Sequence, residues 1–96
     1  MLHLIFQSPV DAAILERMAA DDVVVFLESG VFAGIQASAT AVLIKTMLNS
    51  NRFYVLSEDM QVRGILATEI VPEIGIIDYS GLVKLTVDNQ RIASWC

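Results

Sequence analysis

The sequence has almost no cysteine: its only thiol belongs to Cys96, the last residue. One thiol cannot form an internal disulfide, and together with a single histidine, His3, it does not supply the ligands of a zinc cluster. Neither a CxxC pair nor a glycine-rich phosphate loop is present. We therefore expect no metal site and no bound cofactor.

Long hydrophobic runs are also missing. A membrane-spanning helix needs roughly 20 consecutive apolar residues, whereas runs such as Val23 to Leu27 have the length of core segments. The first six residues contain no basic region and no cleavable signal. The expected location is therefore the cytoplasm, with no membrane partner.

Positive charge is scarce. Six basic residues stand against eleven acidic ones, which gives a formal net charge of −5. The basic residues are scattered along the chain instead of forming a cluster. This balance argues against direct, strong binding to nucleic acid.

Apolar residues, by contrast, are abundant. They make up 55% of a 96-residue chain, and the mean hydropathy is +0.62. So short a chain holds one domain, predicted to span residues 1–96, and a large share of its residues must face outward. We expect part of the apolar surface to contact another subunit.

Short strand-like segments alternate with helical ones. Strands are predicted at Leu2 to Gln7, Val23 to Leu27, Phe53 to Leu56 and Ile74 to Ile77. The second of these is an unbroken β-branched and aromatic run, as in a strand buried on both faces of a parallel sheet.

Helices are predicted between these strands. Ser8-Pro9 should begin a helix that ends near Ala20. An Ala-rich stretch from about Gly34 to Asn49 should form a second helix, with Ala37, Ala41, Ile44 and Leu48 facing the core. Ser57 should cap a short helix that stops at Gly64. The segment from Thr68 to Glu73 reads as a surface connection, and the last helix covers roughly Leu82 to Val87.

This order predicts an α/β fold: a small three-layer domain with a mainly parallel sheet of four to five strands. In such sheets, ligands bind beyond the carboxyl ends of the strands. The candidate crevice residues in those turns are Glu28, Ser29, Gly30, Ser57, Glu58, Asp59, Asp78 and Tyr79.

None of these turns carries a recognisable catalytic motif. The acidic pairs Asp21-Asp22 and Glu58-Asp59 stand at predicted helix boundaries, where they favour interaction with the helix dipole over acid–base catalysis. Ser29 lacks a Gly-x-Ser-x-Gly context. His3, in an apolar strand, is expected to be packed or partly exposed. No catalytic residue is assigned.

Cys96 is the one candidate persulfide acceptor, because sulfane-sulfur transfer requires a thiolate. Reactive cysteines are activated by a helix amino terminus or a nearby cation. Cys96 instead lies beside its own carboxylate and Trp95, which disfavours the thiolate. We do not expect it to carry sulfur.

Four segments together resemble the TusB/DsrH family of sulfur-relay proteins. They are Met1–His3 with Ser8-Pro9, residues 22–31 (DVVVFLESGV), residues 54–64 (YVLSEDMQVRG), and residues 77–86 (IDYSGLVKLT) with Ser94-Trp95. Their order and spacing cover nearly the whole chain.

The resemblance implies the parallel α/β fold of the DsrE/DsrF/DsrH superfamily and assembly with TusC/DsrF-like and TusD/DsrE-like subunits into a heterohexamer. In such complexes the TusD/DsrE-like partner presents the persulfide cysteine. Some DsrH-type members carry a cysteine in their amino-terminal half, which this sequence lacks. The resemblance therefore implies an accessory subunit of a sulfurtransferase complex, not an enzyme by itself, that acts in 2-thiolation of the tRNA wobble uridine.

Three alternatives remain open at the level of sequence. The chain can serve the sulfur-oxidation (Dsr) branch of the family, or it can be a self-associating small-ligand or regulatory module, since isolated superfamily members form homo-oligomers. Alternatively, Cys96 on a mobile tail acts as an independent persulfide acceptor.

Overall fold

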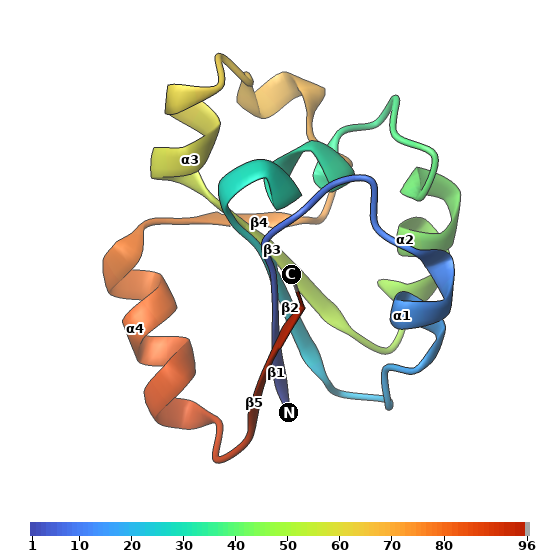
Figure 1. The fold of residues 1–96 in the computed structure, drawn as a ribbon, viewed down its shortest axis with the longest axis vertical. Coiled ribbons are helices and arrows are strands. Elements are labelled where there is room, and N and C mark those ends of the chain that lie inside the picture. Colours follow the sequence, from blue (N-terminus) through green and yellow to red (C-terminus); the bar gives the residue numbers. More distant parts are fainter. Residues whose placement is uncertain (96) are drawn as a thin grey trace.

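A computed structural model describes residues 1–95. Strands and helices alternate along the chain (Figure 1). The strands are β1 (Leu2–Ile5), β2 (Val23–Phe26), β3 (Arg52–Leu56), β4 (Gly75–Ile77) and β5 (Ile92–Trp95). The helices are α1 (Ala12–Glu16), α2 (Ala41–Met47), α3 (Ser57–Val62) and α4 (Tyr79–Asp88), with 3₁₀ helices η1 (Glu28–Gly34) and η2 (Ala67–Glu69).

The five strands form one sheet in the order β4-β3-β2-β1-β5. Every neighbouring pair is parallel. The predicted parallel α/β sheet is confirmed. β2 lies in the centre and all four of its residues are buried, which explains its continuous apolar run. α4 leads from β4 at one edge to β5 at the other.

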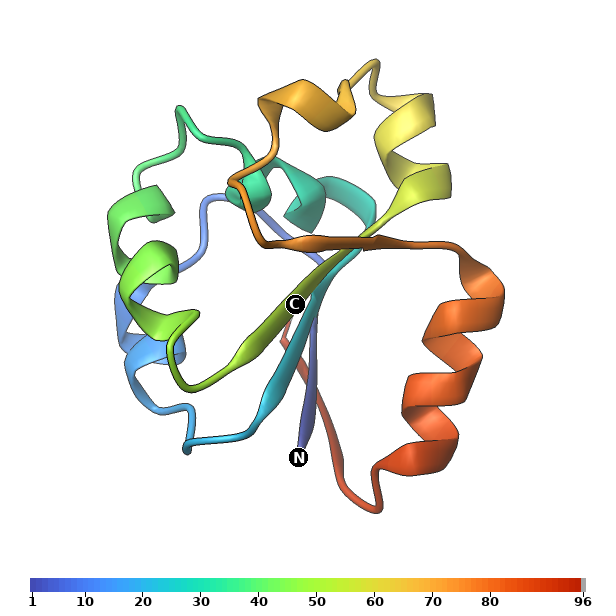
Figure 2. The same cartoon turned by 180° about the vertical axis from the view of Figure 1, so that it is seen from behind.

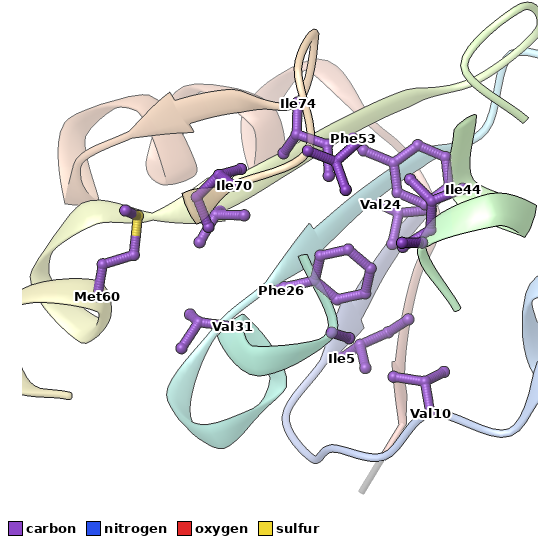
Figure 3. Packing of buried hydrophobic residues seen from close by; sticks show 14 of the residues in the cluster. Ile5, Val10, Val24, Phe26, Val31, Ile44, Phe53, Met60, Ile70 and Ile74 are labelled. Carbon is purple, nitrogen blue, oxygen red and sulfur yellow. The ribbon is translucent and has the colours of Figure 1, made fainter. Parts of the chain in front are cut away.

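The first face of the sheet holds the larger core. It receives alternate residues of the strands, such as Ile5, Phe26 and Phe53, whose side chains meet those of α1, α2 and η1 (Figure 3). The rings of Phe26 and Phe53 pack with centroids 5.9 Å apart. This layer excludes water from one side of the three central strands.

The second face is covered by α4 (Figure 2). Leu2, Val25 and Leu56 from the strands pack beneath Leu82 and Leu85 of this helix. No residue of α4 is itself fully buried. The layer on this face is therefore thinner than the layer on the other.

The first helix differs from its prediction at both ends. Its amino-terminal cap is Asp11, whose carboxylate accepts the N–H of Ala13 at 2.9 Å, and Ser8-Pro9 lies in the preceding connection with a cis peptide bond. The helix ends at Glu16 instead of near Ala20, because the N–H of Ala19 binds the side chain of Asp22.

The predicted helix from about Gly34 to Asn49 is wrong for its first part. η1 ends at Gly34, and Ile35 forms a β-bridge with Ile70. The N–H of Gln36 donates to the carbonyl of Glu69 at 2.8 Å. These tertiary hydrogen bonds hold the segment extended despite its alanines. Consequently Ala37 is exposed, whereas Ala41 and Ile44 of α2 are buried as predicted and Leu48 is half-buried.

The segment from Thr68 to Glu73 is not only a surface connection. Ile70 and Val71 are buried, and the N–H of Val71 donates to the carbonyl of Gly34 at 2.8 Å. This segment therefore closes the end of the first core.

Three further boundaries differ. Ser57 is the first residue of α3 and makes no capping bond, although Gly64 stands just past the end of this helix with a φ of 68°, as predicted. α4 begins at Tyr79 and ends at Asp88, longer than predicted at both ends. β5 was not among the predicted strands; it completes the sheet beside β1.

Candidate functional site

Three turns carry the candidate residues, and the sheet order brings them together. β2 runs into η1 at Glu28, β3 runs into α3 at Ser57, and β4 runs into α4 at Asp78. Because β4, β3 and β2 are adjacent and parallel, these turns lie side by side at the carboxyl edge of the sheet. The structure thus brings together the residues that we expected to line a crevice.

Two carboxylates at this edge connect neighbouring turns. Asp59 Oδ2 accepts the N–H of Glu28 at 2.6 Å, and Glu58 Oε2 accepts the N–H of Tyr79 at 3.2 Å. Glu58 Oε1 also accepts the hydroxyl of Ser57 at 3.1 Å. Both acids lie in the first turn of α3, where the helix dipole favours negative charge. Through these two bonds, α3 connects the turn after β2 to the turn after β4.

Asp78, Glu28 and Gly30 are also engaged in local structure. Asp78 Oδ1 accepts the N–H of Gly81 at 2.9 Å and caps α4. Glu28 has a φ of 51°, an uncommon conformation for a residue with a side chain, and its N–H is the one that Asp59 accepts. Gly30 is buried, and a Cβ there would collide with the carbonyl oxygen of Ile5.

This geometry leaves little that resembles a ligand crevice. The carboxylates at the edge already accept backbone N–H groups, which uses the donors that an anion would need. Of three cavities found in the described part of the chain, with volumes of about 230, 320 and 160 Å³, none is lined by any of the eight candidate residues. The turns are thus built to hold strand ends together.

A second polar cluster, which sequence reasoning did not find, lies on the first face of the sheet at β1. His3 is 5% exposed. Its Nε2 lies 2.9 Å from Asp22 Oδ2, and the indole N–H of Trp95 donates to its Nδ1 at 3.1 Å. Because an indole N–H can only donate, Nδ1 accepts and the Nε2 hydrogen points at the carboxylate.

Asp22 is the centre of this cluster. It also accepts the N–H of Ala19 at 3.1 Å and the α-amino group of Met1 at 3.1 Å. Burial disfavours its charged form, but the bonds from His3, the α-amino group and Ala19 outweigh burial, so the pKa of Asp22 is lowered. The predicted role of Asp21-Asp22 at a helix boundary is wrong, because α1 ends at Glu16.

The local sequence gave one incomplete signal for this cluster. Asp22 stands directly before a buried strand, where it can reach a neighbouring strand. Its partners, however, are 19 residues away at His3, and Trp95 is a further 92 residues from His3. Without the sheet order, and without β5 in it, the three side chains could not be placed together.

Cys96 lies outside the described residues. Among residues 1–95, no group of three His, Cys, Asp or Glu side chains is arranged to hold a metal ion. In the same part of the chain, every helix is too short or too polar to cross a bilayer.

Fold and site together define a class: a small, fully parallel, five-stranded α/β protein whose carboxyl edge is occupied by structural carboxylates. Within that class, residues 6–92 match the model of the DsrH-like protein family. The chain belongs to the DsrH-like family.

Relatives support this assignment over the full length. The chain is 37% identical to Protein TusB of Erwinia tasmaniensis, with 99% of this chain and 100% of the relative covered. It is 31% identical to Protein TusB of Escherichia coli with the same coverage.

Solved structures show the same fold at low sequence identity. A protein of unknown function from Methanobacterium thermoautotrophicum superposes with a TM-score of 0.79 at 11% identity, covering 98% of this chain and 96% of that chain. A Thermotoga maritima protein superposes with a TM-score of 0.62 at 18% identity, covering 95% and 97%.

Proposed function

We propose that the chain is a non-catalytic subunit of a cytoplasmic sulfur-relay complex that supports 2-thiolation of the tRNA wobble uridine. In this role it assembles with TusC/DsrF-like and TusD/DsrE-like subunits, and the TusD/DsrE-like subunit carries the persulfide. The observation that carries the proposal is the full-length similarity to proteins named TusB.

The distribution of thiols supports an assisting role. Residues 1–95 contain no cysteine, and the carboxyl edge of the sheet holds carboxylates in structural hydrogen bonds. A sulfur carrier needs a thiolate that a helix end or a cation activates. No such group occurs in the part of the chain that the structure describes.

The surface supports assembly with partners. Tyr79, Val83 and Val87 follow one another at four-residue spacing on α4, and we call them the α4 stripe; they are 55%, 59% and 78% exposed. Residues at this spacing share one face of a helix. Leu82 and Leu85 of the same helix point to the sheet, so α4 is apolar on both its inner and part of its outer side.

The sheet beside this helix is also incompletely covered. Ile92 and Ser94 of β5 pair with Leu2 and Leu4 of β1, so they lie on the same face as α4. Both are exposed, although parallel sheets are normally covered on both faces. The stripe and this part of the sheet form the surface on which we place a partner subunit.

Co-expression tests the proposal. The chain is produced with TusC- and TusD-like subunits, and the complex is loaded by a cysteine desulfurase and an upstream sulfur carrier. We expect a stable complex in which mass spectrometry finds the added sulfur atom on the TusD-like subunit, and 2-thiouridine formation that requires this chain. Absence of a complex, or transfer by the purified chain alone through Cys96, would contradict it.

A Cys96→Ser variant separates these outcomes. A non-catalytic subunit keeps full tRNA thiolation after this change, whereas an independent persulfide acceptor loses it. If the chain formed a homo-oligomer that binds neither partner, this result would instead favour a self-associating module.

A further inference from the structure

The largest of the three cavities lies along the β4 edge of the sheet, and none of the eight candidate residues lines it. It has a volume of about 320 Å³ and opens between α4 and the β3–β4 edge. Its apolar wall is formed by Tyr54, Ile77 and Leu85, and charged side chains line it at Arg52, Lys84 and Asp88. Its size is at the lower end of the roughly 300–1,000 Å³ of small-molecule sites.

The cavity follows from the strand register. β4 pairs with β3 only from Tyr54 onward, so the start of β3 at Arg52 has no strand on its outer side. A Cβ at Gly75 would lie 2.6 Å from Tyr54 Cδ1, which means that the tyrosine ring occupies space left by the missing side chain. The ring therefore lies over Gly75 and forms part of the cavity wall.

The charges around the cavity are not paired with one another. Among residues 1–95, no ion pair within 4 Å involves Arg52 or Lys84, although Lys84 and Asp88 stand at the i, i+4 spacing that permits one. The lining carries two cations and one carboxylate, so its net charge is positive in a chain whose net charge is −5.

We propose that this cavity binds a small monocarboxylate with a short apolar body. The guanidinium of Arg52 offers the planar fork that matches a carboxylate, and Lys84 adds a second positive charge. The apolar body lies against Tyr54, Ile77 and Leu85. Asp88 repels a second negative charge, which favours monoanions over dianions such as phosphate monoesters.

The site is separate from the partner surface of the proposed function. Lys84 and Asp88 follow a different line along α4 from Tyr79, Val83 and Val87, about 100° further around the helix. The proposal of ligand binding can therefore be wrong while the proposal of partner binding is right, or the reverse, and each has its own test.

An NMR titration of the full chain tests the proposal, with isocaproate as the probe and its neutral amide, isocaproamide, as the matched ligand. We expect saturable shifts of backbone amides around the cavity for isocaproate. The dissociation constant should rise by about threefold or more for isocaproamide, for Arg52→Gln and for Lys84→Gln.

Lys45→Gln is the matched control, because Lys45 is exposed on α2 and lines none of the three cavities. It removes the same charge and should leave the dissociation constant unchanged. The amide spectrum of each variant also reports whether the fold is retained. Equal affinity for the acid and the amide, unchanged affinity in both cavity variants, or shifts confined to other regions would overturn the proposal.

Discussion

A single residue, Asp22, connects the start of β2 to the amino terminus and, through His3, to the end of β5. Its carboxylate binds the α-amino group of Met1, the ring of His3 and the N–H of Ala19. Through His3 it also reaches Trp95 at the end of β5. The cluster joins the edge strand to the centre of the sheet, so its chemistry bears on stability.

Asp22→Asn should reduce the free energy of unfolding at pH 7 by about 1.5–3 kcal/mol, the usual range for a hydrogen bond to a charged group. The lowered pKa of Asp22 sets the pH dependence. The ionised Asp22 carboxylate contributes its full stabilisation above the ordinary aspartate pKa of about 4. This contribution is lost as the pH falls through the lower pKa of Asp22 in the folded protein. Urea unfolding at pH 7 and at successively lower pH should therefore show the two proteins converging below pH ~4.

Asp21→Asn is the control for this prediction. Asp21 is exposed, has a φ of 70°, and makes no side-chain hydrogen bond among the described residues. Asparagine accepts this backbone conformation readily, so stability should change by less than about 0.5 kcal/mol. An equal loss in both variants would show that net charge, not the Asp22 contacts, is responsible.

At this scale the sequence predicts local roles better than distant ones. The acids Glu58 and Asp59 were placed correctly in the first turn of a helix. Their bonds to Tyr79 and Glu28 span 21 and 31 residues, and they depend on which strands are neighbours. Such pairings become visible only with the sheet order.

Among the elements, the buried strands were the most predictable. Residues 23–26 have no polar interruption, and all are buried in the centre of the sheet. β5 was missed because its residues alternate between exposed and half-buried, as suits an edge strand, and so lack a continuous apolar signal. The start of the Ala-rich stretch is extended and not helical as predicted, because helix propensity is weaker than the hydrogen bonds that hold Ile35 and Gln36.

α4 provides the element-scale prediction. It is the only α-helix of the described residues that covers the second face, and its cap is Asp78. Asp78→Ala leaves the N–H of Gly81 without its acceptor and should cost about 1 kcal/mol of unfolding free energy. Thermal and urea unfolding measure this loss.

Ser80→Ala is the matched comparison, since Ser80 is an exposed first-turn residue of α4 with no side-chain hydrogen bond in the described chain. It should leave stability almost unchanged or raise it slightly, because alanine is the better helix former. If Ser80→Ala lowered the free energy of unfolding as much as Asp78→Ala, the capping hydrogen bond of Asp78 would not explain the loss.

In the whole molecule, the two faces of the sheet are covered unequally. α1, α2 and η1 cover one face, whereas α4 alone contributes helical residues to the core on the other. An apolar fraction of 55% is more than this small fold buries. The α4 stripe and Ile92 hold part of the exposed apolar surface, which also includes Val42, Val62 and Leu66. An interface with a partner at the stripe would complete the third layer.

Val87→Glu tests this directly. Val87 is 78% exposed, so the change should alter the free energy of unfolding of the isolated chain by less than about 0.5 kcal/mol. If the stripe meets a partner, burial of an unpaired carboxylate there should reduce recovery of the complex by about tenfold or more. Co-purification with tagged TusC- and TusD-like subunits measures the effect.

Val42→Glu is a closely matched control, because Val42 is a helical valine with 76% exposure on α2, at the other face of the sheet. It introduces the same charge at the same degree of exposure, so general effects of added charge should be equal in the two variants. We expect Val42→Glu to leave complex recovery unchanged. Equal loss in both variants, or no loss in either, would move the partner surface away from α4, because only a contact made by the stripe distinguishes the two valines.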